Sequence, residues 1–387
     1  MATLALTPPP PHVEFSINDA SSSHSEQLRA RMAVLISLPP FRQAVGGDSS
    51  THAESLQVTQ IQGGITNRLY CVSLSGSTAV DTKPVLVRVY GEGSDLFIDR
   101  RMDEAVFREL TVYPSGTFGV KLLATLKDGR IEEFFDGCRT LEPHDMAMPE
   151  LSAVIAATLC EMHHLDVRTC KGENGEKRPV LLEKLRQWYH TASTVTFEED
   201  ISKQEQLDAL NLIRIGQEIE QTLDQQVASK ISSPVVFCHN DLLAGNILVR
   251  GESVENNNEQ REIVFVDVEY SNYNYRGFDI GNHFCEFSGF DYDMFEEKWP
   301  SKNQQYLFLH AYLEKEKELI GDESTDSVDD LYAEVNQYAL GSHLFWGLWA
   351  IIQARHSPIN FDYLKYAKGR FTAYFIAKEL VEKEFWD

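Results

Sequence analysis

The residues best suited to chemistry lie in one short polar segment between two apolar runs. His239, Asp241 and Asn246 follow the spacing H-x-D-x-x-x-x-N, with apolar residues at 235–237 and 247–249. At this spacing in phosphoryl-transfer loops, the Asp accepts the proton of an alcohol and the Asn binds a magnesium ion. The two apolar runs predict a strand on each side of a tight loop. The segment therefore predicts a loop that orients an alcohol and neutralises charge on a transferring phosphate.

A second candidate metal ligand is Asp267. A short turn rich in Asp and Asn also has a purely structural interpretation, because both side chains tolerate turn geometry and bond to their own backbone. Asp267 favours the catalytic interpretation, since it directly follows another apolar run at 263–266. Magnesium prefers hard oxygen ligands, and the pair of Asn246 and Asp267 would provide them.

Composition limits the classes of partner. The chain has 387 residues, enough for two domains, and its 43% hydrophobic and 11% aromatic residues are ordinary for a globular protein. Its formal net charge of −24 disfavours binding of nucleic acid or anionic membranes and would suit a cationic small substrate. The six cysteines form no C-x-x-C pair, which favours reduced thiols. We see neither a basic leader nor a long apolar span and expect a cytoplasmic protein without a membrane helix.

The N-terminal part predicts a tail followed by a β-rich lobe. Residues 1–25 are rich in Pro and Ser and are expected to be disordered. The pattern then predicts helices over 26–38 and 99–113, and strands over 56–62, 68–74, 84–90, 120–126 and 130–135. Gly63-Gly64-Ile65-Thr66-Asn67 lies between the first two strands, where its backbone amides could cover phosphates or simply turn a hairpin.

Arg88 is the candidate phosphate-binding cation of this lobe. It interrupts the apolar strand 84–90, and a buried arginine needs a partner. Asp103 and Glu104 on the following helix could each provide that partner, and the sequence does not choose between them. The alternative is an arginine on an edge strand that reaches solvent. Residues 132–137 would form the hinge to the second lobe, or an ordinary strand end.

The C-terminal part is mainly helical and rich in aromatic residues. Helices are predicted from Pro149 to His163, over 180–189 and over 204–229, and again beyond Asp267. Trp346 and Trp349 are three residues apart and would share a helix face. Such pairs commonly pack in cores, but aromatic rings beside a carboxylate could instead hold an ammonium group, and Glu286 is the carboxylate that we choose. Asp279 is expected to cap a helix or to steady the catalytic loop.

Five segments together resemble the choline/ethanolamine kinases, which have a protein-kinase-like fold: residues 63–67, 87–91, 238–243, 275–284 and 345–349. The resemblance covers about residues 56–375. It implies an α+β fold of two lobes, a small antiparallel β lobe at 26–136 that binds nucleotide and a larger, mainly helical lobe at 137–387. The implied cofactors are ATP and Mg²⁺, with Asp241 as general base and Asn246 and Asp267 as metal ligands.

The resemblance also implies the binding residues, position by position. The nucleotide would be contacted by Gly63, Gly64, Ile65, Thr66, Asn67, Arg88, Glu133 and Phe135. The amino-alcohol pocket would be formed by Glu286, Tyr292, Trp346, Trp349 and Tyr366. Members of the family are often homodimers, but no segment of this chain identifies an interface.

Within the family, Asp241-Leu242-Leu243 resembles the ethanolamine branch, because the choline branch typically has Cys-Gln after this Asp. The run 286–290 also resembles that branch, whereas 275–278 and 284–286 resemble choline kinases as closely. The implied activity is phosphorylation of ethanolamine to phosphoethanolamine, the first step towards phosphatidylethanolamine. A choline kinase or a dual choline/ethanolamine kinase is the alternative. Two more distant ones are an aminoglycoside-type phosphotransferase, expected to have an acidic rather than aromatic pocket, and a catalytically inactive kinase-like binding protein.

Overall fold

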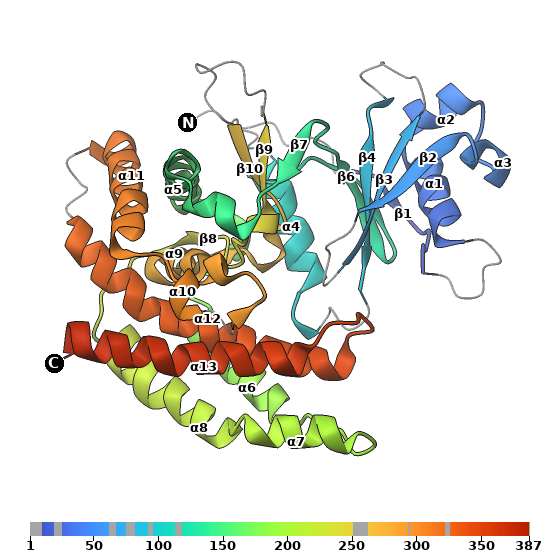
Figure 1. Cartoon of the computed structure of the whole chain (residues 1–387). Helices are drawn as coiled ribbons and strands as arrows, with labels where there is room; N and C mark the ends of the chain where they lie inside the picture. The colour runs from blue at the N-terminus through green and yellow to red at the C-terminus, as the bar shows by residue number, and fades with distance from the viewer. Residues whose placement is uncertain are drawn as a thin grey trace. The chain divides into compact units, whose positions relative to one another are not determined.

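The computed structural model describes residues 10–18, 25–61, 67–74, 82–91, 96–111, 113, 118–250, 262–292, 295–321 and 326–386. The chain forms two compact units, Met1–Cys138 with Ser357–Ile359, and Arg139–His356 with Asn360–Asp387. The division falls two residues beyond the boundary that the sequence suggested. The first unit is rich in strands and the second is larger and mainly helical, as the predicted α+β class requires (Figure 1).

The smaller unit is built on a six-stranded sheet with the strand order β1-β5-β6-β4-β3-β2. Five strands pair antiparallel: β2 (Leu56–Ile61), β3 (Asn67–Leu74), β4 (Val85–Tyr90), β5 (Leu122–Leu126) and β6 (Gly129–Glu133). A Lys127-Asp128 turn joins β5 to β6, and the Asp128-Gly129 sequence at this point is typical of a hairpin. A Cβ at Gly129 would lie 2.2 Å from the carbonyl oxygen of Arg88, so only glycine allows β6 to pack here against β4.

The N-terminal segment differs from the prediction. Strand β1 (His12–Val13) pairs in parallel with β5. The Asp128 carboxylate accepts hydrogen bonds from Ser16 Oγ and from the backbone N–H of Ile17 and Asn18, at 2.7, 2.9 and 2.6 Å. The prediction of disorder is therefore wrong for residues 10–18, because a two-residue strand held by backbone bonds and one remote carboxylate has no apolar pattern to recognise. Residues 1–9 and 19–24 lie outside the described part.

The described residues of the smaller unit also form the helices α1 (Glu26–Ser37), α2 (Pro39–Val45), α3 (Ser50–Ala53) and α4 (Arg100–Leu110). Helix α1 begins at Ser25, whose side chain accepts from the N–H of Leu28. Its buried Ala30, Ala33 and Val34 pack with the apolar residues of β2 and β3. Helix α4 is strongly amphipathic and buries Val106, Phe107 and Leu110.

The larger unit holds two small sheets. Strand β8 (Val235–Cys238) pairs with β11 (Asn272–Tyr275), and β9 (Ile247–Arg250) lies between β10 (Glu262–Phe265) and β7 (Cys138–Thr140). The sequence correctly predicted a strand on each side of Asp241. These strands belong to different sheets, however, so the loop between them joins two sheets and does not close a hairpin.

Helices make up most of the larger unit: α5 (Pro149–His163), α6 (Leu181–Ala192), α7 (Ile201–Ala209), α8 (Leu212–Gln217), the π-helix η5 (Glu218–Ala228), α9 (Arg276–Cys285), α10 (Phe295–Lys298), α11 (Lys302–Ile320), α12 (Val328–His356), α13 (Tyr363–Val381) and the π-helix η11 (Glu382–Trp386). Short 3₁₀ segments are η3 (Pro143–Ala147), η4 (Arg168–Cys170), η6 (Ala244–Asn246), η7 (Val268–Tyr270) and η8 (Glu286–Ser288). None of the helices in the described ranges has both the length and the apolar character that a membrane crossing requires.

The prediction of a single helix over 204–229 is wrong in one respect. Helix α7 ends at Ala209, and Asn211 adopts φ 51° and begins α8, where its side chain accepts from the N–H of Arg214. Asparagine tolerates this left-handed conformation better than other non-glycine residues. The helical periodicity continues across the break and therefore conceals it.

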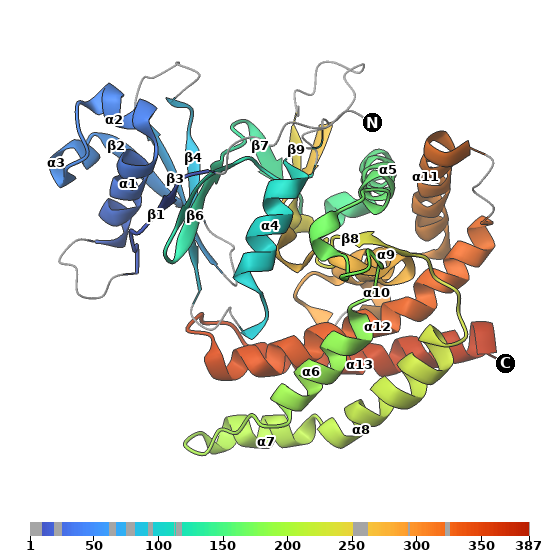
Figure 2. The same ribbon diagram turned by 180° about the vertical axis from the view of Figure 1, so that it is seen from behind.

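Helices α12 and α13 carry three of the five residues predicted to bind substrate, and α9 leads directly into η8, where Glu286 lies. Helix α12 packs along both α9 and α13, and the two long helices lie side by side in both views (Figure 1, Figure 2). A Cβ at Gly281 of α9 would lie 2.9 Å from backbone atoms of Ala339 on α12. This close approach fixes α9, and with it Asp279, against the longest helix of the unit.

Candidate active site

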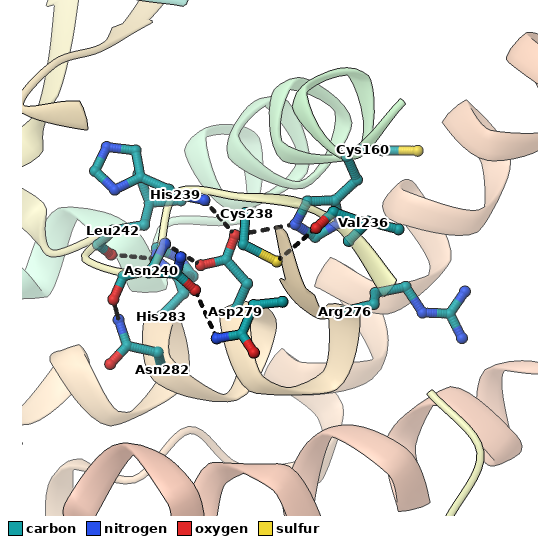
Figure 3. A network of polar contacts seen from close by, with 12 residues as sticks. Cys160, Val236, Cys238, His239, Asn240, Leu242, Arg276, Asp279, Asn282 and His283 are labelled. Atoms are coloured by element: carbon teal, nitrogen blue, oxygen red, sulfur yellow. Dashed lines mark hydrogen bonds and ion pairs between the residues drawn. The ribbon is translucent and has the colours of Figure 1, made fainter. Parts of the chain in front are cut away.

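The predicted catalytic loop, residues 239–246, rests on a buried carboxylate of α9 (Figure 3). Asp279 accepts hydrogen bonds from the backbone N–H of His239 at 2.8 Å and of Asn240 at 2.7 Å. His163 Nε2 lies 3.0 Å from the same carboxylate. Although burial opposes ionisation, these hydrogen bonds and the two histidines lower the pKa of Asp279 below its usual value. Of the two roles expected for Asp279, it therefore steadies the loop.

Further side chains hold the loop on both sides. Asn240 adopts φ 66°, and its side chain donates to Tyr270 O at 2.9 Å. His283 Nδ1 lies 2.9 Å from Leu242 O, and Asn282 Nδ2 donates to Asn240 O at 3.4 Å. His239 Nε2 lies 3.0 Å from Val266 O. The backbone of the loop is thus fixed before any substrate binds, which is the condition for precise positioning of a base.

Three buried side chains next to this loop could each offer a ligand atom to a metal ion. Donor atoms of His163, Cys238 and Asp279 lie within 4.8 Å of one another. Both ring nitrogens of His163 are engaged, however, since Nδ1 lies 2.8 Å from the hydroxyl of Tyr312. Burial raises the pKa of the Cys238 thiol well above its usual value, which keeps the proton on sulfur. We therefore interpret the three as structural support of the loop.

Asp241, Asn246 and Asp267 converge as the sequence predicted. Asn246 Nδ2 donates to Asp241 O at 2.8 Å and to Asp241 Oδ2 at 3.2 Å. The N–H of Val266 donates to Asn246 O at 2.9 Å, which brings the end of β10 next to Asn246. Asp267 follows with φ 64° and ψ 56°, a left-handed conformation that Asp and Asn accept.

Negative charge accumulates around Asp241. Burial is the largest cause that raises its pKa well above the usual value, followed by the charges of Glu286, Asp267 and Glu269, while the hydrogen bond from Asn246 acts in the opposite direction. Asn246 bonds to Asp241 through Nδ2. Its Oδ1 accepts no hydrogen bond from the described residues and is therefore a candidate metal ligand. An amide oxygen among several carboxylates is a donor set that fits Mg²⁺.

The two tryptophans of α12 share a face, as predicted, and both are buried. The rings of Trp346 and Trp349 lie 5.6 Å apart at an interplanar angle of 79°. Trp349 Nε1 donates to the hydroxyl of Tyr270 at 3.1 Å, and the Tyr270 ring lies 5.2 Å from that of Trp346. Sequence reasoning missed Tyr270. Its position three residues after Asp267, in a polar and aromatic segment, was the available signal.

Glu286 is buried, with 4% of its surface exposed, and it is paired with Arg370 of α13. Arg370 Nε also donates to the Tyr366 hydroxyl at 2.9 Å. Burial raises the pKa of Glu286 above its usual value, although Arg370 opposes this. The sequence analysis missed Arg370. The signal was an arginine one helical turn after Tyr366, a spacing that places both on one face.

Arg88 is paired with a residue that the sequence analysis did not consider. Arg88 Nε lies 3.1 Å from Glu132 Oε1, and Arg88 is 4% exposed on the internal strand β4, which excludes the solvent-exposed alternative. Asp103 instead pairs with Arg130 at 2.7 Å, and Glu104 pairs with Arg108. Both expected partners are therefore wrong. The partner comes from the neighbouring strand β6, and cross-strand neighbours depend on the sheet order, which single-strand patterns do not reveal.

The other predicted nucleotide contacts are partly described. Gly63, Gly64, Ile65 and Thr66 lie outside the described residues. Asn67 is buried at the start of β3, and its Oδ1 accepts from the N–H of Gly91 at 3.4 Å. Glu133 is exposed at the end of β6, and Phe135 is half-buried in the segment that follows.

Comparisons with known proteins agree with this geometry. Residues 58–375 match the family model described as choline/ethanolamine kinase. The chain is 38% identical over 317 residues to a probable ethanolamine kinase of Arabidopsis thaliana, covering 82% of this chain and 78% of the relative. It is 32% identical over 355 residues to choline kinase alpha of Mus musculus, covering 84% and 76%. The solved structure of a Plasmodium vivax ethanolamine kinase superimposes with a TM-score of 0.72 at 25% identity, covering 94% of this chain and 93% of that one. A match that extends across both units, with the loop, the acidic cluster and the paired tryptophans in place, shows that this chain belongs to the choline/ethanolamine kinase family.

Proposed function

We propose that the protein transfers a phosphoryl group from ATP to the hydroxyl of ethanolamine, giving phosphoethanolamine for phosphatidylethanolamine synthesis. The observation that carries the proposal is the convergence of a base and a cation-binding set. Among the charged groups that raise the pKa of Asp241, Glu286 contributes most. Tyr270 links the catalytic loop to Trp349 through hydrogen bonds at both its backbone and its hydroxyl. An alcohol and an ammonium group two carbons apart would suit these neighbouring sets.

Each residue of the loop then has one task. Asp241 accepts the proton of the substrate hydroxyl, and a raised pKa makes its carboxylate a stronger base for that step. Asn246 orients Asp241 through Nδ2. Asn246 Oδ1 and Asp267 would hold Mg²⁺, which when bound neutralises charge on the phosphates. In the smaller unit, Arg88 and the segment Gly63–Asn67 would contact the phosphates, and Glu133 and Phe135 the adenine.

Discrimination between amines follows from their hydrogen-bonding capacity. The primary ammonium of ethanolamine has three N–H donors, whereas the quaternary ammonium of choline has none and depends on aromatic faces. Glu286 Oε1 is bonded to Arg370, while Oε2 accepts no hydrogen bond within the described part of the chain. A carboxylate oxygen that can still accept a hydrogen bond favours the primary amine. A choline kinase or a dual choline/ethanolamine kinase is the alternative.

A coupled assay of ADP release tests the proposal directly. With Mg²⁺-ATP saturating, we expect kcat/KM for ethanolamine to exceed that for choline by about 10-fold or more, since the site's polar acceptor would be left unpaired by choline. A preference for choline would contradict the ethanolamine assignment and leave the family assignment intact. Activity on neither amine would contradict the proposed amino-alcohol kinase activity as well.

Trp349→Ala is expected to raise the KM for the amine by about 10-fold and to change the KM for ATP by less than about twofold, because one desolvated aromatic face is worth up to about 2 kcal/mol to a cation. Trp349→Phe should give an intermediate increase. Trp188→Phe provides a matched control, since Trp188 is equally buried in the same unit and packs 4.2 Å from the ring of Phe345. It should lower stability without changing either KM. An equal rise of both KM values in Trp349→Ala would indicate packing alone.

Three further expectations belong to this proposal. A cytoplasmic location suits the proposed substrates, and a net charge of −24 argues against nucleic-acid partners. A homodimer is supported by the family resemblance alone.

A further inference from the structure

Arg370 contacts three of the five residues proposed to bind the amine. It is 0% exposed, and its guanidinium donates to Glu286 and, at 2.9 Å, to the hydroxyl of Tyr366. The guanidinium carbon lies 4.3 Å from the centroid of the Tyr292 ring. A buried arginine is costly unless its charge and its donors are matched, and these contacts match them.

A chain of hydrogen bonds extends from Arg370 to the catalytic loop. Arg370 Nη1 donates to Ser342 Oγ at 3.4 Å, and Ser342 Oγ donates to Asn282 Oδ1 at 2.7 Å. The same oxygen accepts from Trp346 Nε1 at 2.8 Å, while Asn282 Nδ2 donates to Asn240 O at 3.4 Å. Arg370 is therefore connected to one of the pocket tryptophans and to the residue that precedes Asp241.

Tyr292 lies closer to Arg370 than Tyr366 does: the guanidinium carbon is 4.3 Å from the centroid of the Tyr292 ring and 5.4 Å from that of the Tyr366 ring. One face of its ring is covered by Arg370, and its hydroxyl donates to Cys285 O at 3.0 Å. A ring whose face already holds a guanidinium cannot offer that face to a substrate ammonium. Tyr292 is thus placed to support Arg370.

We propose that Arg370 is the positioning residue of the amine pocket. It holds Oε1 of Glu286 so that Oε2 is presented to the ammonium group, and it holds the Tyr366 hydroxyl in place, while Tyr292 supports Arg370 instead of contacting the substrate. The inference rests on the proposed function, because it assigns Glu286 to the amine. It predicts an effect on amine binding that is separate from ATP binding.

The pairing of Arg370 with Glu286 should also affect how binding of the amine depends on pH. Burial is the main cause that raises the pKa of Glu286, and Arg370 is the group that opposes it, so loss of Arg370 should raise that pKa further. The other titratable groups around this pair are Asp241, Tyr292, Tyr366, Cys285 and His343. None of them is a second cation, because burial lowers the pKa of His343 well below its usual value. An acid with a higher pKa loses its charge at a higher pH, so amine binding should weaken earlier as the pH falls.

The test measures both KM values, kcat and Tm of Arg370→Met and Arg370→Lys between about pH 8 and about pH 6. Arg370→Met should raise the amine KM by about 10- to 100-fold, with the ATP KM within about twofold, and the rise should steepen towards low pH. Arg370→Lys should restore part of the loss, because it keeps the charge but not the planar donor array. Arg186→Met is the matched control, since Arg186 also forms ion pairs, with Glu220 and Asp224, but on the surface of α6. It should change neither KM.

Tyr292 variants provide a second measurement if Arg370→Met does not fold. Tyr292→Leu removes the ring beneath Arg370 and should raise the amine KM with the same pH trend, whereas Tyr292→Phe keeps the ring and should raise the amine KM less. The proposal would be overturned by an unchanged or lower amine KM in the foldable Arg370 variants, by a parallel rise of both KM values, or by Lys performing no better than Met. The parent enzyme, assayed with ethanolamine and choline, reports separately on the proposed function.

Discussion

Asp241→Asn is expected to lower kcat by about 10³-fold, because the variant keeps the shape of the loop but has no carboxylate to accept the hydroxyl proton. The amide cannot act as a base, while the KM for ATP and for the amine should change little, since Asp241 acts on the reacting hydroxyl. Rapid-quench or steady-state ADP release at saturating substrates measures this loss.

In Asp241→Asn, the stability of the folded state should rise or stay the same while kcat falls. Burial, Glu286, Asp267 and Glu269 raise the pKa of Asp241, so the folded state resists ionisation of this group. For an acid with a raised folded pKa, stability falls as the pH rises from the unfolded pKa towards the folded one. A neutral Asn removes that cost, and Asp241→Asn without metal or nucleotide should unfold at a temperature equal to or above the parent's.

Asp145→Asn is the matched control for the direction of this change in stability. Arg139 and the backbone N–H of Glu142 bond to Asp145, and these contacts lower the pKa of its carboxyl despite partial burial. A depressed folded pKa contributes stability above the unfolded pKa, so Asp145→Asn should lower Tm at neutral pH. A destabilised Asp241→Asn, or one with near-normal kcat, would show that Asp241 is a structural carboxylate.

The local parts of the site were predictable from sequence, and the long-range parts were not. The spacing of Asp241 and Asn246 encodes one loop, and its chemistry follows from residue types within a few positions. Asp267 needed only an apolar run that ends in a carboxylate. By contrast, β8 and β9 lie in separate sheets, and no pattern within either strand indicates which neighbour it has.

Buried charge pairs account for most of the remaining differences. The sequence identified Arg88 as a buried charge that needs a partner and Glu286 as the carboxylate for an ammonium group, but their observed partners, Glu132 and Arg370, came from other elements. Burial of an arginine is readable from its apolar surroundings, whereas its partner is set by packing between elements distant in the chain. The same reasoning explains Asp128, whose carboxylate orders residues 16–18 more than a hundred positions away.

Asp267→Asn should lower kcat by about 10³-fold and raise the Mg²⁺ concentration needed for half-maximal rate, because a neutral amide binds a hard divalent cation more weakly than a carboxylate does. The Asn substitution suits this position. Asp267 has φ 64° and ψ 56°, which Asn adopts as readily as Asp. The loss should therefore occur without a change in Tm. Titration of Mg²⁺ at fixed ATP separates a metal ligand from a residue that only shapes the loop.

Asp267→Ala should lose the same activity and, in addition, about 1–2 kcal/mol of stability, since a left-handed alanine is strained. Asn211→Ala is the control for such a destabilisation, since it combines strain at φ 51° with loss of the side-chain cap of α8 and lies outside the catalytic loop. It should lower Tm by a comparable amount and leave kcat and the Mg²⁺ dependence unchanged. If Asp267→Asn kept the parent's Mg²⁺ dependence, or if its activity loss tracked a fall in Tm as in Asn211→Ala, Asp267 would be a conformational residue. The metal would then have to be held by other carboxylates near Asp241. Of these, Glu269 is the nearest in sequence to Asp267.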